Sequence, residues 1–307
     1  MDERNQADTT HRGPRRIGVT GARGFVASRL IPMLLRDGAE VIAILRPGRE
    51  RSTLPEWNVE VRHADLDQAD GFSAAFDGCD AVVHLSGMFQ GPQMARALDA
   101  ARVPCAVFVS SAGVHTRLAS ASAEAKRVGE AAVNAARVRA TILRPSMIYG
   151  TAADRNLARL IGWVAERGVV PLPGGGITPQ QPVHVDDLAQ AIRAALARPA
   201  NEDRVYDVGG PVALPLREMV RIISGIVGRK AVIVPLPIGA THAAIVLMRR
   251  LGLPAPIRPE QILRLGESKA VDISAAVRDL GFSPRSFKEG IRPEVAEVMS
   301  KRGLTAT

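Results

Sequence analysis

The chain reads Thr20-Gly21-Ala22-Arg23-Gly24-Phe25-Val26-Ala27 between a short apolar segment, residues 16–19, and an amphipathic segment that extends to residue 36. The first segment predicts a strand and the second a helix with one apolar face. Gly21 permits a tight turn, and Gly24 lets the backbone approach a pyrophosphate, which the unpaired N–H groups of the helix N-terminus stabilise. The stretch therefore predicts a dinucleotide-binding turn between the first strand and the first helix.

Further βα units follow this turn. Apolar segments that predict strands cover residues 40–45, 59–64, 81–85, 106–110 and 140–144. Helical patterns between them include residues 72–76, 93–101 and 123–137. Strands that alternate with helices pair in parallel, so we expect an α/β fold with a Rossmann-type, doubly wound parallel sheet. Ligands of such sheets bind at the carboxyl ends of the strands, where the strand order reverses.

We expect three regions along the chain. Residues 1–15 are polar and mixed in charge, which is typical of a disordered tail. Residues 16–170 form mainly the NAD(P)-binding Rossmann domain. Residues 171–307 form mainly a smaller C-terminal substrate lobe, with parts that return to the Rossmann sheet.

Two local features are expected early in the lobe. The segment Pro171-Leu172-Pro173-Gly174-Gly175-Gly176 predicts a loop. A helix over residues 188–197 follows, and Asp186 or Asp187 is expected to cap it.

Composition limits the function classes. Hydrophobic residues make up 46% of the 307 residues, enough for a sizeable core. Cys79 and Cys105 show no metal-site spacing and no disulfide framework, so no metal is expected and a reducing compartment is indicated. No signal-peptide pattern and no run of about 18 apolar residues is visible, and we expect a cytoplasmic protein.

The net charge of +9 is unevenly placed. Residues 211–307 hold 15 basic and eight acidic side chains, a net charge of +7. This excess indicates either a solvated, arginine-rich surface or contact with an anionic ligand or a membrane surface. Nucleic acid is not expected as a partner, because aromatic residues make up only 4% and no recognition motif is present.

The end of the second strand distinguishes NAD from NADP. An acidic residue there accepts hydrogen bonds from the ribose 2′-hydroxyl, whereas an arginine accommodates a 2′-phosphate. The strand ends Leu45-Arg46-Pro47-Gly48-Arg49, Arg51 follows, and Arg23 lies in the first turn. A basic surface loop is the alternative, but four arginines near one expected phosphate favour NADP(H) over NAD(H).

Thr-Gly-Ala-x-Gly-Phe-Val resembles the start of an extended short-chain dehydrogenase/reductase, the superfamily of nucleotide-sugar epimerases and dehydratases. Ala27 stands at the family's third glycine, a position that serves helix–strand packing. The segments 181–189, 206–211 and 279–284 are also similar to family segments. The resemblance therefore extends from about residue 16 to about residue 292.

The resemblance implies a set of cofactor residues. Asp65 and Leu66 resemble the pair that contacts adenine, and residues 84–87 resemble the loop that passes the ribose and pyrophosphate. Lys126 resembles the lysine that binds the nicotinamide ribose, whereas His84 is expected to be structural. The full set is Gly21, Ala22, Arg23, Gly24, Phe25, Val26, Arg46, Asp65, Leu66, Leu85, Ser86, Gly87, Ser110, Lys126, Pro145 and Met147.

The family's usual mechanism requires a tyrosine four residues before the lysine, and Ser122 stands there instead. A serine hydroxyl is far less acidic than a phenol that a nearby lysine activates. Ser111 matches the serine that assists the tyrosine. His115 follows closely and is either a substitute acid or base, since imidazole exchanges protons near neutral pH, or a polar loop residue. The catalytic candidates are Ser111, Lys126, Ser122 and His115.

The chain is also short between Gly87 and Ala101, where classical epimerases carry a longer segment. The pattern is most similar to the group related to the accessory subunit of respiratory complex I, which keeps the NADP site and often loses the tyrosine. Three hypotheses follow: an NADP(H)-dependent oxidoreductase with altered acid–base residues, a non-catalytic NADPH-binding protein with a structural, redox-sensing or quinone-related assembly role, and a nucleotide-sugar epimerase or dehydratase. Ser122 and the short segment disfavour the third, and the substrate is not identified.

Residues 238–253 predict an apolar helix that includes Arg249 and Arg250 near its end. The segment is too short to cross a bilayer. It is compatible with a core helix, a lid over the substrate cleft, or an interfacial helix with arginines at the lipid headgroups. The last possibility adds membrane association to the expected location.

Overall fold

The computed structural model describes residues 14–68, 72–154, 156–198, 204–254 and 259–304. Most of the expected N-terminal tail, residues 1–15, lies outside these ranges. The chain divides into two compact units with separate hydrophobic cores. The first unit contains residues 1–110, 125–143 and 189–205, and the second contains residues 111–124, 144–188 and 206–307.

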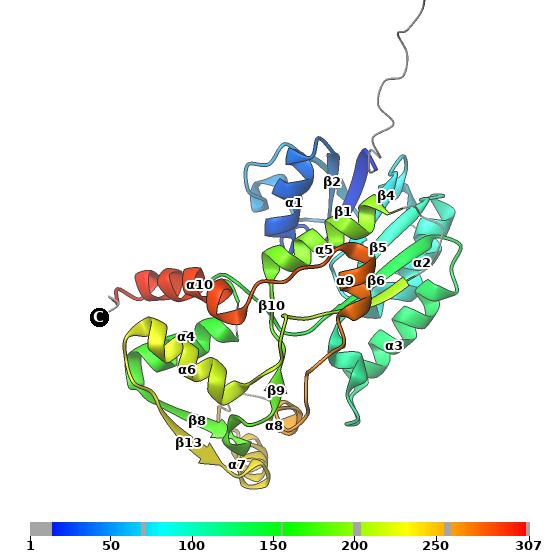
Figure 1. Cartoon of the computed structure of the whole chain (residues 1–307). Coiled ribbons are helices and arrows are strands. Elements are labelled where there is room, and N and C mark those ends of the chain that lie inside the picture. Colours follow the sequence, from blue (N-terminus) through cyan, green and yellow to red (C-terminus); the bar gives the residue numbers. More distant parts are fainter. Residues whose placement is uncertain (1–13, 69–71, 155, 199–203, 255–258, 305–307) are drawn as a thin grey trace, which may run out of the picture. The chain divides into compact units, whose positions relative to one another are not determined.

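The central sheet has seven strands in the order β11-β6-β5-β4-β1-β2-β3 (Figure 1). Its strands are β1 (Arg16–Thr20), β2 (Glu40–Leu45), β3 (Glu60–His63), β4 (Ala81–His84), β5 (Cys105–Val109), β6 (Arg139–Pro145) and β11 (Arg204–Val208). The pairings from β3 through β6 are parallel. The order reverses between β1 and β4, which confirms the expected doubly wound α/β fold.

The helices beside this sheet are α1 (Ala27–Arg36), α2 (Gly91–Ala100), α3 (Ala121–Asn134) and α5 (Val185–Ala197). Met94 and Leu98 of α2 and Val133 of α3 share one core with Phe108 and Ile142 of the strands. Residues 72–76, where a helical pattern was expected, contain the short 3-10 helix η2 (Ser73–Phe76). An ion pair of 2.5 Å between Arg193 and Asp37 joins α5 to the end of α1.

Helices α2 and α3 meet through backbone atoms. A Cβ placed on Gly129 of α3 would lie 1.9 Å from the carbonyl oxygen of Met88, and one placed on Gly91 would lie 2.6 Å from the carbonyl oxygen of Gly129. A methyl group cannot fit at either distance. Glycine is therefore required at both positions, and it fixes the distance of α3 from the segment that begins α2.

The second unit has a core of three helices, α4 (Leu157–Arg167), α6 (Leu216–Val227) and α10 (Phe287–Lys301). Its other helices are α7 (Ile238–Arg250), α8 (Pro259–Arg264) and α9 (Ser274–Leu280). Short strands pair two by two: β7 (Ile148–Tyr149) with β10 (Val183–His184), β9 (Pro179–Gln180) with β12 (Leu214–Pro215), and β8 (Val169–Pro173) with β13 (Val232–Leu236).

The loop expected over residues 171–176 is only partly found. Residues 171–173 belong to β8, which pairs in parallel with β13, and the 3-10 helix η5 (Gly174–Gly176) follows. The partner strand lies about sixty residues later in the chain. A local reading of prolines and glycines therefore could not detect this pairing.

The expected aspartate cap is wrong. Helix α5 begins at Val185, so Asp186 and Asp187 both lie in its first turn. Asp187 is buried and accepts hydrogen bonds from the Arg285 backbone N–H and from Nε, each at 2.9 Å. This carboxylate joins α5 to the segment before α10 instead of capping a helix.

Candidate functional site

The glycine-rich turn packs against the loop that follows β4. Gly21 has a φ of +65°, and a Cβ there would lie 3.1 Å from the carbonyl carbon of Leu85. The Gly24 N–H donates to the Gly21 carbonyl oxygen at 2.8 Å and closes the turn. The sequence thus places glycine where the backbone is left-handed and where two loops touch.

His84 anchors the loop after β4. Its Nδ1 accepts from the Thr20 hydroxyl at 2.9 Å, and its Nε2 donates to the Gly87 carbonyl oxygen at 3.0 Å. The Leu85 N–H donates to the same Thr20 oxygen at 3.2 Å. Burial lowers the pKa of His84 to about 4, so the ring stays neutral at physiological pH. The histidine is a structural link between two loops.

A cavity of about 290 Å³ opens beside the turn. The residues that line it are Gly21, Ala22, Arg23, Ile44, Leu45, Arg46, Arg49, Ala64, Leu66, Ser86 and Gln90. They come from the turn after β1 and from the carboxyl ends of β2, β3 and β4. This is the edge of the sheet where a doubly wound fold binds its ligand, next to the reversal of strand order.

Six of the expected cofactor residues line the cavity: Gly21, Ala22, Arg23, Arg46, Leu66 and Ser86. Six others are their near neighbours in the chain: Gly24, Phe25, Val26, Asp65, Leu85 and Gly87. The Asp65 carboxylate accepts from Gln68 Nε2 at 3.0 Å and from the Asp67 N–H at 3.2 Å. These hydrogen bonds, the one from Gln68 first, hold the pKa of Asp65 below its usual value.

Two polar residues that the sequence did not single out organise the cavity wall. Asp67 forms an ion pair of 3.0 Å with Arg46 and accepts from Gln90 Nε2 at 2.6 Å. The chain Arg46–Asp67–Gln90 therefore orients the arginine at the end of β2. Neither residue belongs to a short motif, so no local signal in the sequence identified them.

The four arginines near the expected phosphate differ in their placement. Arg23, Arg46 and Arg49 line the cavity. Arg51 instead donates from Nη1 to the Val59 carbonyl oxygen at 3.0 Å and from Nη2 to the Trp57 carbonyl oxygen. Three arginines thus remain at the cavity, and the fourth holds a neighbouring loop.

Ser110 and Lys126 also belong to the first unit. Ser110 follows β5, and its hydroxyl donates to Glu130 of α3 at 2.5 Å. Lys126 lies half-buried on α3, four residues after the exposed Ser122, so both occupy the same face of that helix. Ser122 thus lies one helical turn before Lys126.

The remaining candidates lie in the second unit. Ser111 begins the 3-10 helix η4 (Ala112–His115), and its Oγ accepts from the Gly113 N–H at 3.1 Å. His115 Nε2 lies 2.9 and 3.0 Å from the two carboxylate oxygens of Asp207. Pro145 ends β6, and the backbone carbonyl of Met147 accepts from the Val183 N–H at 2.9 Å. Asp207 is a partner that the sequence analysis missed.

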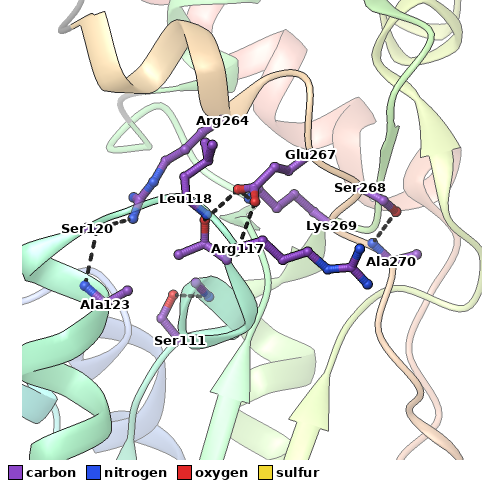
Figure 2. Close-up of polar contacts among 12 residues, drawn as sticks. Ser111, Arg117, Leu118, Ser120, Ala123, Arg264, Glu267, Ser268, Lys269 and Ala270 are labelled. Atoms are coloured by element: carbon purple, nitrogen blue, oxygen red, sulfur yellow. Dashed lines mark hydrogen bonds and ion pairs between the residues drawn. The ribbon is translucent and has the colours of Figure 1, made fainter.

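The loop after His115 is bound by the last residue of α8 and by a residue that follows this helix (Figure 2). Glu267 accepts from the Thr116 hydroxyl at 2.5 Å and from the Arg117 N–H at 2.9 Å. Arg264 donates to Ser120 Oγ at 2.6 Å. These contacts join the loop between η4 and α3 to the end of α8 and the segment after it.

The first unit fits a dinucleotide by its chemistry. Gly21 and Gly24 leave room beside backbone N–H groups for a pyrophosphate, and the cavity wall supplies guanidinium groups for a further phosphate. Ile44, Leu45 and Ala64 give the cavity an apolar wall suited to a flat ring. Among the described residues, no group of three His, Cys, Asp or Glu side chains could hold a metal ion.

Replacing Gly21 by Ala is expected to weaken NADPH binding at least tenfold and to lower stability by about 1–3 kcal/mol, because the methyl group meets Leu85 in a left-handed backbone. Isothermal titration and thermal unfolding measure the two effects. Gly38→Ala is the matched control, since Gly38 also has a positive φ but nothing lies within 4 Å of the added Cβ. Equal effects of the two variants on NADPH binding would contradict the role of the contact.

Comparisons with known proteins agree with this site. The family model described as NAD(P)H-binding matches residues 21–199. NADH dehydrogenase (ubiquinone) 1 alpha subcomplex subunit 9 from Arabidopsis thaliana is 34% identical over 56% of this chain and 43% of its own length. The Mus musculus protein of the same name is 30% identical over 72% of this chain and 63% of its own. Ceramide reductase from Caulobacter vibrioides is 29% identical over 60% and 61%. This chain thus covers less than two thirds of each relative.

Solved structures match over nearly the whole chain. MoeE5 in complex with UDP-glucose and NAD has a TM-score of 0.73 at 21% identity, over 94% of this chain and 100% of that chain. The UDP-glucuronic acid 4-epimerase from Bacillus cereus in complex with NAD has a TM-score of 0.71 at 20% identity, over 93% and 99%. At these identities the likeness shows a common fold. The chain therefore belongs to the NAD(P)H-binding family, as a member of the short-chain dehydrogenase/reductase superfamily related to the alpha subcomplex subunit 9 of NADH dehydrogenase.

Proposed function

We propose that this protein is an NADP(H)-dependent oxidoreductase that reduces a carbonyl or quinone, with His115 in place of the usual tyrosine. The observation that carries the proposal is the cavity of the first unit, where Arg23, Arg46 and Arg49 surround the end of β2. Residues 41–49, which run from β2 through the turn after it, contain no carboxylate to accept from a ribose 2′-hydroxyl. Arginine recognises a phosphate through charge-assisted hydrogen bonds, so the wall favours the 2′-phosphate of NADP(H).

The ion pair between Arg46 and Asp67 does not block this recognition. Both side chains are about half exposed or more, and an ion pair of this kind contributes at most about 1 kcal/mol. A 2′-phosphate carries more charge than one carboxylate and offers three acceptor oxygens. The ion pair therefore orients Arg46 before the cofactor binds, and the 2′-phosphate replaces Asp67 as the partner of Arg46.

The names of several relatives support a reductase. Ceramide reductase from Caulobacter vibrioides and vestitone reductase from Medicago sativa are both similar to parts of this chain. A bound NADPH would supply a hydride to the substrate. The proton for the resulting oxygen then has to come from the protein or from water.

We assign that proton to His115. Its Nε2–H donates to the Asp207 carboxylate, which orients the ring, and Nδ1 is left to exchange the proton. Ser111 accepts from a backbone N–H, which leaves its hydroxyl hydrogen available as a donor. Lys126 holds the ribose hydroxyls, as the family resemblance implies.

A non-catalytic NADPH-binding role is the second candidate. Ser122 in place of the tyrosine favours it, and so does the relation to a subunit of NADH dehydrogenase. A panel of aldehydes, ketones and short-chain quinones separates the two roles. NADPH oxidation with any class supports the enzyme, whereas tight NADPH binding with no oxidation across the panel supports the second candidate.

Arg46→Ala is expected to weaken NADPH binding about 10- to 100-fold and to change NADH binding less than about twofold, because a charge-assisted hydrogen bond to the 2′-phosphate is lost. Nicotinamide fluorescence titration measures both constants. Arg51→Ala is the matched control, because it removes an equal charge from an arginine that points to Val59 and Trp57. Equal losses for NADPH and NADH would refute the assignment of the 2′-phosphate to Arg46.

A further inference from the structure

We propose that the exposed face of α7 docks on an anionic lipid bilayer. From Ile238 to Met248 this helix carries only two polar side chains, Thr241 and His242. A helix that is apolar on all sides is normally buried in a core or in a membrane. In α7, however, Ile245 is the one buried residue. The helix therefore presents apolar surface that its own chain leaves uncovered.

The exposed apolar residues are large and gather at the end of the helix and in the three residues that follow Arg250. Leu247, Leu251 and Leu253 are 57%, 65% and 50% exposed. Leu247 and Leu251 are four residues apart, so they project from the same side. Arg249 and Arg250 lie between them and are also exposed. The end of α7 thus combines leucines with two guanidinium groups.

The exposed face belongs to a part of the second unit that is firmly held. Helices α7 and α8 pack together, with Ile245 and Ile262 buried. Arg264, the last residue of α8, and Glu267, which follows the helix, form the hydrogen bonds drawn in Figure 2, which join this segment to the loop of residues 116–120. Leu247 therefore projects from a helix that packs against its neighbour in the second unit.

The charge around the leucines selects the partner. Residues 211–307 carry a net charge of +7, and two of the arginines stand beside the leucines. At a bilayer surface the leucines enter the boundary of the acyl chains, while the guanidinium groups stay among anionic headgroups. A second copy of this chain carries the same excess of positive charge in this part of the sequence, which disfavours a dimer through this face.

The helix is expected to lie on the bilayer. It has 13 residues, whereas about 20 apolar residues are needed to cross the hydrocarbon core. Within the described residues, no helix combines the length and the hydropathy that a membrane span requires. Docking through one helix end and two charges predicts reversible binding that salt weakens.

Vesicle flotation tests the proposal directly. The full chain is mixed with vesicles of phosphatidylcholine alone, or of phosphatidylcholine with phosphatidylglycerol, at low and high salt. We expect binding to the anionic vesicles that falls at high salt and is at least tenfold weaker on phosphatidylcholine alone. Equal binding to both vesicles, or binding to neither, would overturn the proposal.

Variants locate the contact. The double variant Leu247→Gln, Leu251→Gln is expected to lose at least about tenfold in vesicle affinity, and Arg249→Gln, Arg250→Gln about fivefold for each arginine. Val212→Gln, Val277→Gln changes two exposed valines elsewhere in the second unit and should bind as the unmodified protein does. Far-ultraviolet circular dichroism shows that each variant is folded.

Two results would exclude α7 as the docking face. One is unchanged vesicle binding by the leucine variant. The other is a dimer of the unmodified chain, measured by light scattering, that the leucine variant dissociates; this would assign the face to self-association. The test uses no cofactor, so it stands apart from the proposed oxidoreductase activity.

Discussion

His115→Gln is expected to slow NADPH-dependent reduction by a factor of about 100 to 10,000 while NADPH affinity stays unchanged, because a positioned general acid contributes a rate factor of that size. The variant keeps a polar side chain but cannot carry the transferred proton. His115 belongs to η4 in the second unit, and the arginines that line the cavity belong to the first. The rate is measured as the loss of NADPH absorbance with the best substrate from the panel of aldehydes, ketones and quinones.

Asp207→Asn separates two roles of Asp207: the orientation of the His115 ring and the negative charge beside it. The asparagine oxygen can still accept from His115 Nε2–H, but the variant lacks the negative charge beside the ring, so a loss smaller than that of His115→Gln is expected. His242→Gln on α7 is the control for removing a histidine from the same unit. Wild-type rates in His115→Gln would assign the proton to water or to Ser111 and would remove His115 from the mechanism.

Glu294→Gln is expected to stabilise the protein at alkaline pH and to leave its stability unchanged near pH 4.5. Glu294 is fully buried; its Oε2 accepts from the Gly150 N–H at 2.7 Å, and its Oε1 has no hydrogen-bond partner. Burial, and secondarily the charge of Asp154, raise its pKa from 4.5 to about 8. The buried group therefore stays protonated where an exposed glutamate is ionised.

The sign of the pH dependence follows from proton binding. Between pH 4.5 and about 8 the folded chain holds a proton on Glu294 that the unfolded chain has released, so stability falls as pH rises through this window. Below the window both states are protonated, and above it both are ionised. The loss is about 5 kcal/mol at most, which corresponds to a shift of roughly 10 °C in melting temperature.

Thermal unfolding of both proteins from pH 4.5 to 9 measures the difference. Glutamine keeps an oxygen for the Gly150 N–H and carries no charge, so the advantage of Glu294→Gln should grow with pH until about pH 8. Glu218→Gln removes an exposed carboxylate that pairs with Arg221, and it serves as the control. A difference between the variant and the parent that does not change with pH would show that Glu294 ionises normally.

The sequence was sufficient for the first unit because its signals are local. The turn around Gly21 and the apolar segments after it predict strand, turn and helix one after another, and the parallel sheet follows from their alternation. The same logic predicts which loops approach the ligand, since all of them follow strands. Six of the expected cofactor residues do line the cavity.

Other features could not be predicted because they depend on partners far away in the chain. Strand β8 is fixed by β13, and Asp207 is brought to His115 from 92 positions later. Arg51 resembles Arg46 in the sequence, but two backbone carbonyls hold it elsewhere. Glu294 reads as an ordinary helical glutamate until its burial is known. In each case tertiary packing decides, and residue type alone does not.

The distance between α3 and the segment that begins α2 is set by contact between their backbones, so a change of side-chain size cannot adjust it. Because Gly129 of α3 touches the carbonyl group of Met88, α3 cannot come closer to Met88 and has no room for a side chain at Gly129. A library of variants that randomises Gly91 and Gly129 would therefore contain few folded members. Replacing the exposed Ser122 by tyrosine leaves the contact between Gly129 and Met88 unchanged and keeps the four-residue separation from Lys126. Helix α3 is therefore the place to begin when engineering tyrosine-dependent chemistry into this scaffold.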